Sequence, residues 1–168
     1  MGRRPAADAE WFASEVTTHL DAVYRYFLRR SAVQDAEDLA AEVFEIAWRR
    51  RADVPVDWVL PWLYRTAGFV LANHRRRVRA LPLQLADEPI DDDHAHRIAE
   101  RDRLSRALAE LSERDRDILL MHAWEGLTGD ELAAALGISR SGAQAALSRA
   151  RARLRLVWVP IVQDPTSR

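Results

Sequence analysis

The chain has 168 residues, is 48% apolar and carries a net charge of −1, so it can form one packed domain or two small ones and is not a disordered protein. It contains no cysteine, which excludes a disulfide framework, a thiolate nucleophile and a cysteine-based zinc site. The sequence has no membrane-length apolar run and no apolar secretion signal, so we expect a cytoplasmic protein without a membrane span. A nearly neutral charge argues, by itself, against a simple nucleic-acid binder.

Three helices are predicted in the first half of the chain. Residues 9–30 repeat an apolar side chain every three or four positions, which is typical of one amphipathic helix. The apolar stripe consists of Phe12, Val16, Leu20, Val23 and Phe27. A second helix begins at Asp35, where carboxylates favour the positive helix N-terminus, and a third begins near Pro61 and runs to Arg77. Residues 53–57 between them contain a proline and two carboxylates and predict a loop.

Residues 80–97 break the helical period. Two prolines and five carboxylates lie there against a single arginine, Arg97, which predicts a flexible acidic linker between two helical domains. We expect these carboxylates to compete with DNA phosphate for arginine-rich surfaces elsewhere on the chain. His94 and His96 lie beside the acidic run, but no third element is placed to close a coordination shell, so no metal site is expected.

Two further helices are predicted directly after the linker. The first carries apolar side chains at helical spacing from Leu104 to Leu111. The second begins at a cap formed by Ser112 with Asp115, holds Trp124 and ends at Gly126. No segment alternates with a period of two over a useful length, so the predicted fold class is all-α, with two small helical domains.

Residues 127–155 predict two helices joined by a glycine turn, which is the pattern of a helix-turn-helix that binds duplex DNA. Thr128 and Glu131 form a capping box, Gly137 ends the first helix, and Ser139 caps the second. The second helix buries one face and collects polar donors on the other, where bases and phosphates would be contacted. The candidate contact residues are Arg140, Ser141, Gln144, Ala145, Ser148, Arg149 and Arg151. An ordinary amphipathic helix with a solvated arginine face is the alternative for this segment alone.

Aromatic side chains alternate with arginines between Trp58 and Arg77, which is typical of surfaces that hold single-stranded nucleic acid. Stacking one base on a ring contributes about 1 to 3 kcal/mol, comparable with the cost of unstacking it from a duplex. Helical spacing favours a core position for Trp62 or Phe69, whereas Trp58 lies next to the loop and is the better candidate for exposure. No catalytic grouping or phosphate-binding glycine loop stands out, so neither enzymatic activity nor a cofactor is expected.

Over about residues 9–157 the chain resembles the extracytoplasmic-function (ECF) group of the sigma-70 family. The segments that carry the resemblance are 35–48, 61–67, 73–77, 111–120 and 150–154. It implies sigma region 2 at 9–79, the linker at 80–97, sigma region 4 at 98–158 and a C-terminal tail at 159–168. Residues 141–146 depart from the family pattern, because they replace two basic residues and introduce Gly142 into the first helical turn.

The resemblance implies a non-catalytic subunit of RNA polymerase that directs promoter recognition, DNA melting and transcription initiation. Its implied partners are promoter DNA, the β′ clamp and β flap of core polymerase, and the anti-sigma factor that the family often has. The residues implied to bind core polymerase are Asp35, Asp38, Glu42, Glu45 and Arg49. Those implied to bind melted minus-ten DNA are Val54, Pro55, Asp57, Trp58, Trp62, Arg65, Asn73, Arg75, Arg76 and Arg77.

Two alternatives remain open on the sequence. A stand-alone dimeric helix-turn-helix regulator would bind a palindrome without polymerase, because half-site spacing mirrors two-fold symmetry. A protein-interaction module that has lost promoter recognition, suggested by Gln144 and Ala146, would show no promoter specificity in the presence of core polymerase.

Overall fold

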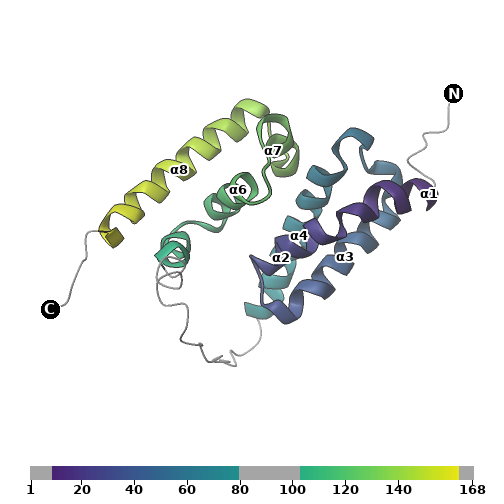
Figure 1. Ribbon diagram of the computed structural model, residues 1–168, viewed down its shortest axis with the longest axis horizontal. Coiled ribbons are helices and arrows are strands. Elements are labelled where there is room, and N and C mark those ends of the chain that lie inside the picture. Colours follow the sequence, from purple (N-terminus) through teal and green to yellow (C-terminus); the bar gives the residue numbers. More distant parts are fainter. Residues whose placement is uncertain (1–8, 80–102, 163–168) are drawn as a thin grey trace.

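A computed structural model describes residues 9–79 and 103–162, and every regular element within these ranges is helical (Figure 1). The predicted acidic linker at 80–97, with His94 and His96, lies outside the described residues. So do residues 163–168 of the predicted tail, whereas residues 159–162 continue the last helix rather than leave it.

The N-terminal segment is not the single α-helix predicted over residues 9–30. It consists of α1 (Ala9–Trp11), a π-helical turn (Phe12–Val16), a 3-10 turn (Thr17–His19) and α2 (Leu20–Leu28). The hydroxyl groups of Thr17 and Thr18 donate to the carbonyls of Ala13 and Glu15, and such local side-chain bonds accompany the irregular backbone. Leu20 is consequently 49% exposed and does not belong to the core, contrary to the predicted stripe.

Helices α3 (Ala36–Arg49) and α4 (Val59–Arg79) complete the first module. The loop predicted at 53–57 is largely taken up by two short 3-10 turns, Arg51–Asp53 and Val56–Trp58. Helix α4 packs against both α2 and α3, and its proline lies in the first turn, where a missing N–H costs nothing. Tyr26, Phe27 and Leu63 are the largest fully buried side chains of this module.

The second module begins with a helix over residues 103–109 and continues with α6 (Glu113–Ala123), α7 (Gly129–Leu136) and α8 (Arg140–Val162). The predicted caps are confirmed. Thr128 and Glu131 form the capping box, and the hydroxyl of Ser139 accepts the N–H of Gly142 at 3.1 Å. Gly137 has φ +66°, the left-handed conformation that ends α7. Trp124 lies just beyond α6 and is exposed, so the sequence placed the end of that helix slightly too late.

The start of α6 is held by a capped ion pair. The Ser112 hydroxyl accepts the N–H of Asp115, and the Asp115 carboxylate accepts bonds from Arg153 of α8 at 2.8 and 2.6 Å. Burial alone would raise the pKa of Asp115. The hydrogen bond from Ser112 and the charge of Arg153 outweigh it, so the pKa is lowered from its usual value.

We expect Asp115→Asn to lower the free energy of unfolding by about 1 kcal/mol near neutral pH, because it removes a charge-assisted bond whose arginine is largely exposed. A carboxyl with a depressed pKa stabilises the folded state above its unfolded pKa, and that stabilisation is lost as the pH falls through its folded pKa. The difference between wild type and variant in urea unfolding should therefore vanish in acid. A difference independent of pH would contradict this assignment.

The two modules are packed against each other. In Figure 1, α8 runs along the outer side of the second module, and α6 and α7 lie between it and the first module. Helix α4 packs against α7, and one cluster of buried apolar side chains continues from the first module to Met121, Leu127 and Leu132 of the second. A smaller cluster around Ile118 joins α6 to α8. The sequence predicted two helical modules but gave no sign of this contact between them.

Candidate nucleic-acid interface

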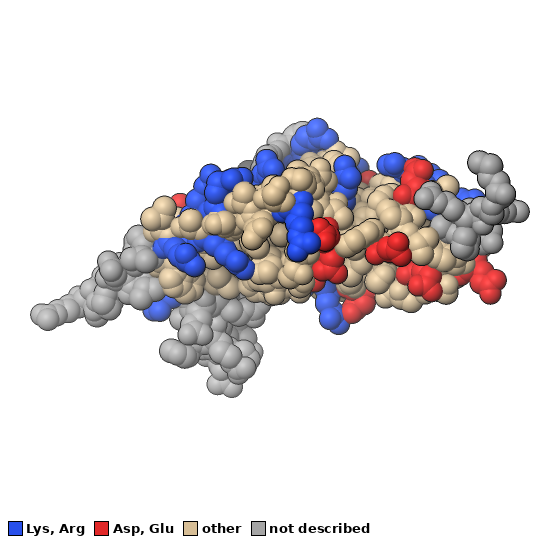
Figure 2. Space-filling view, turned by 90° about the horizontal axis from the view of Figure 1, so that it is seen from above, with Lys and Arg blue, Asp and Glu red and all other residues tan. Residues whose placement is uncertain are grey.

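Helix α8 is packed on one face and open on the other. Ala143, Ala146 and Ala150 are buried against α6 and α7, so small side chains bring the helix close to its supports. All seven side chains that the sequence predicted for duplex binding are exposed: Arg140, Ser141, Gln144, Ala145, Ser148, Arg149 and Arg151. In Figure 2, basic side chains predominate on the half of the molecule that carries α8. The open face thus offers amide and guanidinium donors, the kinds of group that base edges and phosphates accept.

Two arginines of this face are oriented by neighbouring elements. The Arg140 guanidinium donates to Asp130 of α7 at 3.0 Å. Arg151 lies 2.6 Å from Nε2 of His122, whose Nδ1 bonds the carbonyl of Leu127 at 3.0 Å. Because that carbonyl can only accept, Nδ1 carries the proton and Nε2 accepts from Arg151.

Gly142, where the chain departs from the family pattern, has a local structural role. A Cβ added at this position would come 3.1 Å from the Ser139 hydroxyl, which caps the same turn. The glycine therefore lets the first turn of α8 close tightly on its cap.

The loop before α4 and the outer face of α4 form the second candidate surface. Pro55, Asp57, Trp58, Arg65, Asn73, Arg76 and Arg77 are exposed. Trp62 is half-buried, with the Arg50 guanidinium 6.0 Å from its ring centre, whereas Val54 is buried and its side chain cannot meet a base. Phe69 is 62% exposed, more than any other aromatic side chain in the described residues. Helical spacing predicted a core position for at least one of Trp62 and Phe69; Trp62 packs partly buried against the core, whereas Phe69 does not belong to it.

Two arginines predicted for minus-ten DNA lie next to the second module, of which Arg75 is half-buried and Arg65 is exposed. Arg75 lies 3.6 Å from the Glu113 carboxylate and donates to the carbonyl of Arg30 at 3.4 Å. The Arg65 guanidinium lies so close to the helix-turn-helix turn that a Cβ added at Gly137 would come within 2.9 Å of it. Both side chains line a cleft of about 480 Å³ between α4 and the second module.

The acidic face of α3 is the third candidate surface. Asp38, Glu45 and Arg49 are exposed, and Glu45 pairs with Arg49 one helical turn on at 3.7 Å. Asp35 and Glu42 instead face the end of α4, at 3.3 Å from His74 and 3.5 Å from Arg77 respectively. The five residues that the resemblance assigns to polymerase binding therefore divide into exposed charges and charges that pair with α4.

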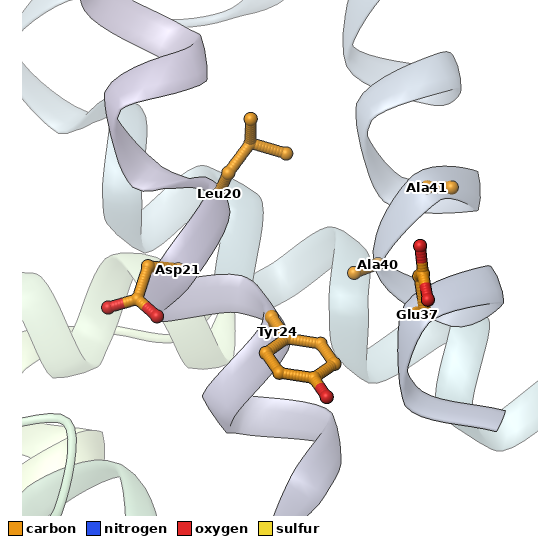
Figure 3. Close-up of a pocket in the computed structure, with 6 residues that line it drawn as sticks. All are labelled: Leu20, Asp21, Tyr24, Glu37, Ala40 and Ala41. Atoms are coloured by element: carbon orange, nitrogen blue, oxygen red, sulfur yellow. The ribbon is translucent and has the colours of Figure 1, made fainter. Parts of the chain in front are cut away.

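A shallow apolar groove of about 460 Å³ lies beside this face, between α2 and α3 (Figure 3). Leu20 and Tyr24 extend from α2 toward α3, which contributes Glu37, Ala40 and Ala41, while Asp21 turns away from the groove. The sequence did not predict the groove, because it assigned Leu20 to the core of a regular helix.

Buried charge is concentrated where the modules meet. Burial raises the pKa of Tyr26, and burial together with the nearby Glu125 carboxylate raises the pKa of Tyr64 to about 12. Burial also raises the pKa of Asp117, although Arg30 and Arg75 oppose it. Within the described part of the chain, no three His, Cys, Asp or Glu side chains are grouped to hold a metal ion, and no helix is long and apolar enough to cross a membrane.

These features define an all-helical protein of two packed modules, one with a helix-turn-helix and the other with an exposed aromatic and arginine surface. Residues 101–154 match the family model of sigma-70, region 4. The ECF RNA polymerase sigma factor SigF of Caulobacter vibrioides is 34% identical over 136 residues, which cover 74% of this chain and 73% of that protein. The chain belongs to the ECF family of sigma factors.

A second relative is the ECF RNA polymerase sigma factor SigE of Mycolicibacterium smegmatis, 33% identical over 150 residues that cover 83% of this chain and 58% of the relative. The chain spans about half the length of several relatives that it matches. Two solved structures share the fold. CnrH in complex with the cytosolic domain of CnrY superposes with a TM-score of 0.63 at 24% identity, covering 92% of this chain and 93% of that one. RpoE of Bartonella quintana, in complex with the anti-sigma factor NepR, superposes with a TM-score of 0.64 at 21% sequence identity. The match covers 94% of this chain and 100% of that one.

Proposed function

We propose that this chain is a sigma factor that directs RNA polymerase to promoters and captures the melted DNA. The observation that carries the proposal is the exposed donor face of α8 on a capped helix-turn-helix, in a chain of the ECF family. The phosphodiester chemistry would belong to the polymerase, so the chain itself needs no catalytic residue. It would act in the cytoplasm, where the polymerase and the DNA are.

Transcription in vitro tests the proposal directly. Purified core polymerase, a genomic DNA library and the full chain should give transcripts that start at a defined set of promoters and that are absent without the chain. Specific binding to a palindrome by a dimer without polymerase would favour the stand-alone regulator instead. Transcripts unchanged by the chain would favour a module without promoter recognition.

We expect Gln144→Ala to relax sequence selection in the minus-thirty-five duplex. Gln144 projects from the first turns of α8, where a bidentate amide contact contributes about 1 to 3 kcal/mol of base discrimination. Arg151→Ala should weaken binding more uniformly, because a guanidinium further along the helix reaches phosphates. Arg103→Ala removes an exposed arginine outside α8 and is the matched control. Identical selected sequences for wild type and Gln144→Ala would contradict the assignment.

Core polymerase would bind the first module through the exposed charges of α3 and the adjoining groove. This surface combines an apolar floor with acidic side chains, an arrangement that suits a protein partner with apolar and basic residues. The β flap of the polymerase would bind the second module. We infer an anti-sigma factor among the partners as well, since RpoE, which has the same fold, is bound by one. Co-purification from cells that express a tagged chain would identify it.

A further inference from the structure

The Tyr26 hydroxyl is a polar group that the fold buries without a partner. The Tyr26 side chain, on α2, is 0% exposed, and its oxygen has no hydrogen-bond partner among the described residues. An unpaired buried hydroxyl costs free energy, so the large majority of such groups in folded proteins are hydrogen-bonded. Burial raises the pKa of Tyr26, so the hydroxyl keeps its proton and is available to donate. Its position therefore suits an acceptor that the described residues do not supply.

The cleft between α4 and the second module reaches this tyrosine. Tyr26 is among the residues that line its volume of about 480 Å³, and so is Gly68 of α4. A Cβ added at Gly68 would lie 3.8 Å from the Tyr26 oxygen, so a longer side chain there would cover the hydroxyl from the side of α4. Glycine weakens a helix interior relative to alanine, and here it keeps that side open. The volume lies within the range of about 300 to 1,000 Å³ that is typical of small-molecule sites.

The less exposed of the two carboxylates that line the cleft is already paired. Asp117 lies 3.3 Å from Arg30, which also pairs with the buried Glu125 at 2.9 Å. Glu125 forms a second ion pair, with Arg29 at 2.7 Å. The Arg30 guanidinium lies 3.8 Å from the centre of the Tyr26 ring, so it covers the face of the ring. These ion pairs join the end of α2 to the second module and neutralise the charge of Asp117 beside the cleft.

Positive charge predominates at the rim of the cleft. Arg65, Arg75 and Arg114 line it, against the carboxylates of Glu113 and Asp117. Arg75 lies close to Glu113, but Arg65 and Arg114 are exposed and have no ion-pair partner in the described part of the chain. Arg65 precedes the glycine beside the hydroxyl by three positions, so both lie on one side of α4. An anion between them would be bound by both donors.

We propose that this cleft binds a small organic anion with a flat apolar body. Its acid group accepts hydrogen bonds from Tyr26 and Arg65, and its apolar body packs against Phe69 of α4 and Met121 of α6, which also line the cleft. A few polar groups on mainly apolar walls are the usual composition of such a site. Binding here does not require promoter recognition by the chain, since none of the described residues of α8 lines the cleft.

Titration of the isotope-labelled full chain with naphthoate, a flat aromatic carboxylate, tests the site by NMR. The chain has six glycines, and the amide signal that disappears in Gly68→Ala identifies Gly68. That signal should shift and saturate with a Kd on the order of 1 mM, as expected for a ligand of this size. The uncharged naphthamide, which has the same shape, should bind several-fold more weakly. No saturable shift of the Gly68 signal, or equal affinity for the acid and the amide, would overturn the site.

Tyr26→Phe tests the hydroxyl, because it keeps the ring and removes only the unpaired group. Its affinity for naphthoate should fall about tenfold, since a hydrogen bond to a charged acceptor is lost. Helicity by circular dichroism should be unchanged, because the hydroxyl has no partner within the described fold. Tyr24→Phe makes the same change on the same helix outside the cleft and should bind as the wild type does. Equal Kd values for Tyr26→Phe and wild type would also overturn the site.

Arg65→Gln tests the charge without touching the core, because Arg65 is exposed. It should weaken naphthoate binding several-fold and leave the weaker binding of naphthamide unchanged. Arg25→Gln removes an exposed arginine of α2 outside the cleft and should change neither affinity. If Tyr26→Phe loses helicity, Arg65→Gln decides, and wild-type affinity for naphthoate in that variant would count against the site.

Discussion

Replacing Asp38 by arginine is expected to lower the affinity of the chain for core RNA polymerase about tenfold, which corresponds to about 1.4 kcal/mol. Asp38 is exposed on α3, next to the groove lined by Glu37 and Ala41. The substitution replaces a negative charge by a positive one, a change of two units. It places this cation opposite a surface of core polymerase that is expected to be basic. Such a substitution at the rim of an interface slows association and makes the affinity more sensitive to salt.

A pull-down titration of purified core polymerase with labelled chain measures this effect at two salt concentrations. Glu110→Arg is the control, because it makes the same change of charge at an exposed position outside α3. Asp38→Arg should retain wild-type helicity, since the side chain is exposed. Equal affinity of Asp38→Arg and wild type for core polymerase would remove α3 from the proposed interface.

Truncating Leu63 to alanine is expected to lower the free energy of unfolding by about 3 kcal/mol. Leu63 lies on α4, is fully buried, and belongs to the cluster that continues into the second module. The loss of its methyl groups leaves a cavity that the packed helices cannot fill completely. Because small domains are stable by only about 5 to 15 kcal/mol, this change removes a large fraction of the total.

Urea unfolding followed by circular dichroism measures the loss at Leu63. Val33→Ala is the control, since Val33 is 69% exposed and its truncation should change stability by less than about 0.5 kcal/mol. Similar urea midpoints of unfolding for Leu63→Ala and Val33→Ala would mean that the Leu63 side chain of α4 is not buried in the core.

The helix-turn-helix was predictable because its signals are local. Thr128 and Glu131 are three residues apart, and Gly137 and Ser139 specify the turn through their own backbone preferences. The N-terminal segment was mispredicted because periodicity reports only which side chains share a face. It does not report that threonine hydroxyls at 17 and 18 bond the backbone and accompany a change of helix type.

The contact between the modules was not predictable from local patterns. Arg29 and Glu125 are 96 positions apart, and each reads in the sequence as an ordinary solvated charge. The same holds for Arg75, whose residue type suits DNA equally well whether or not the second module covers it. Only its contacts with Glu113 and the carbonyl of Arg30 separate Arg75 from the exposed Arg76 and Arg77.

The composition of the contact also gives it a temperature dependence. Buried apolar side chains such as Met121 and Leu132 belong to the cluster that the modules share, and the ion pairs of Glu125 also join the modules. Apolar association weakens on cooling, and the cost of dehydrating charges falls on warming. Both effects act in one direction, so warming favours docked modules and cooling favours separated ones.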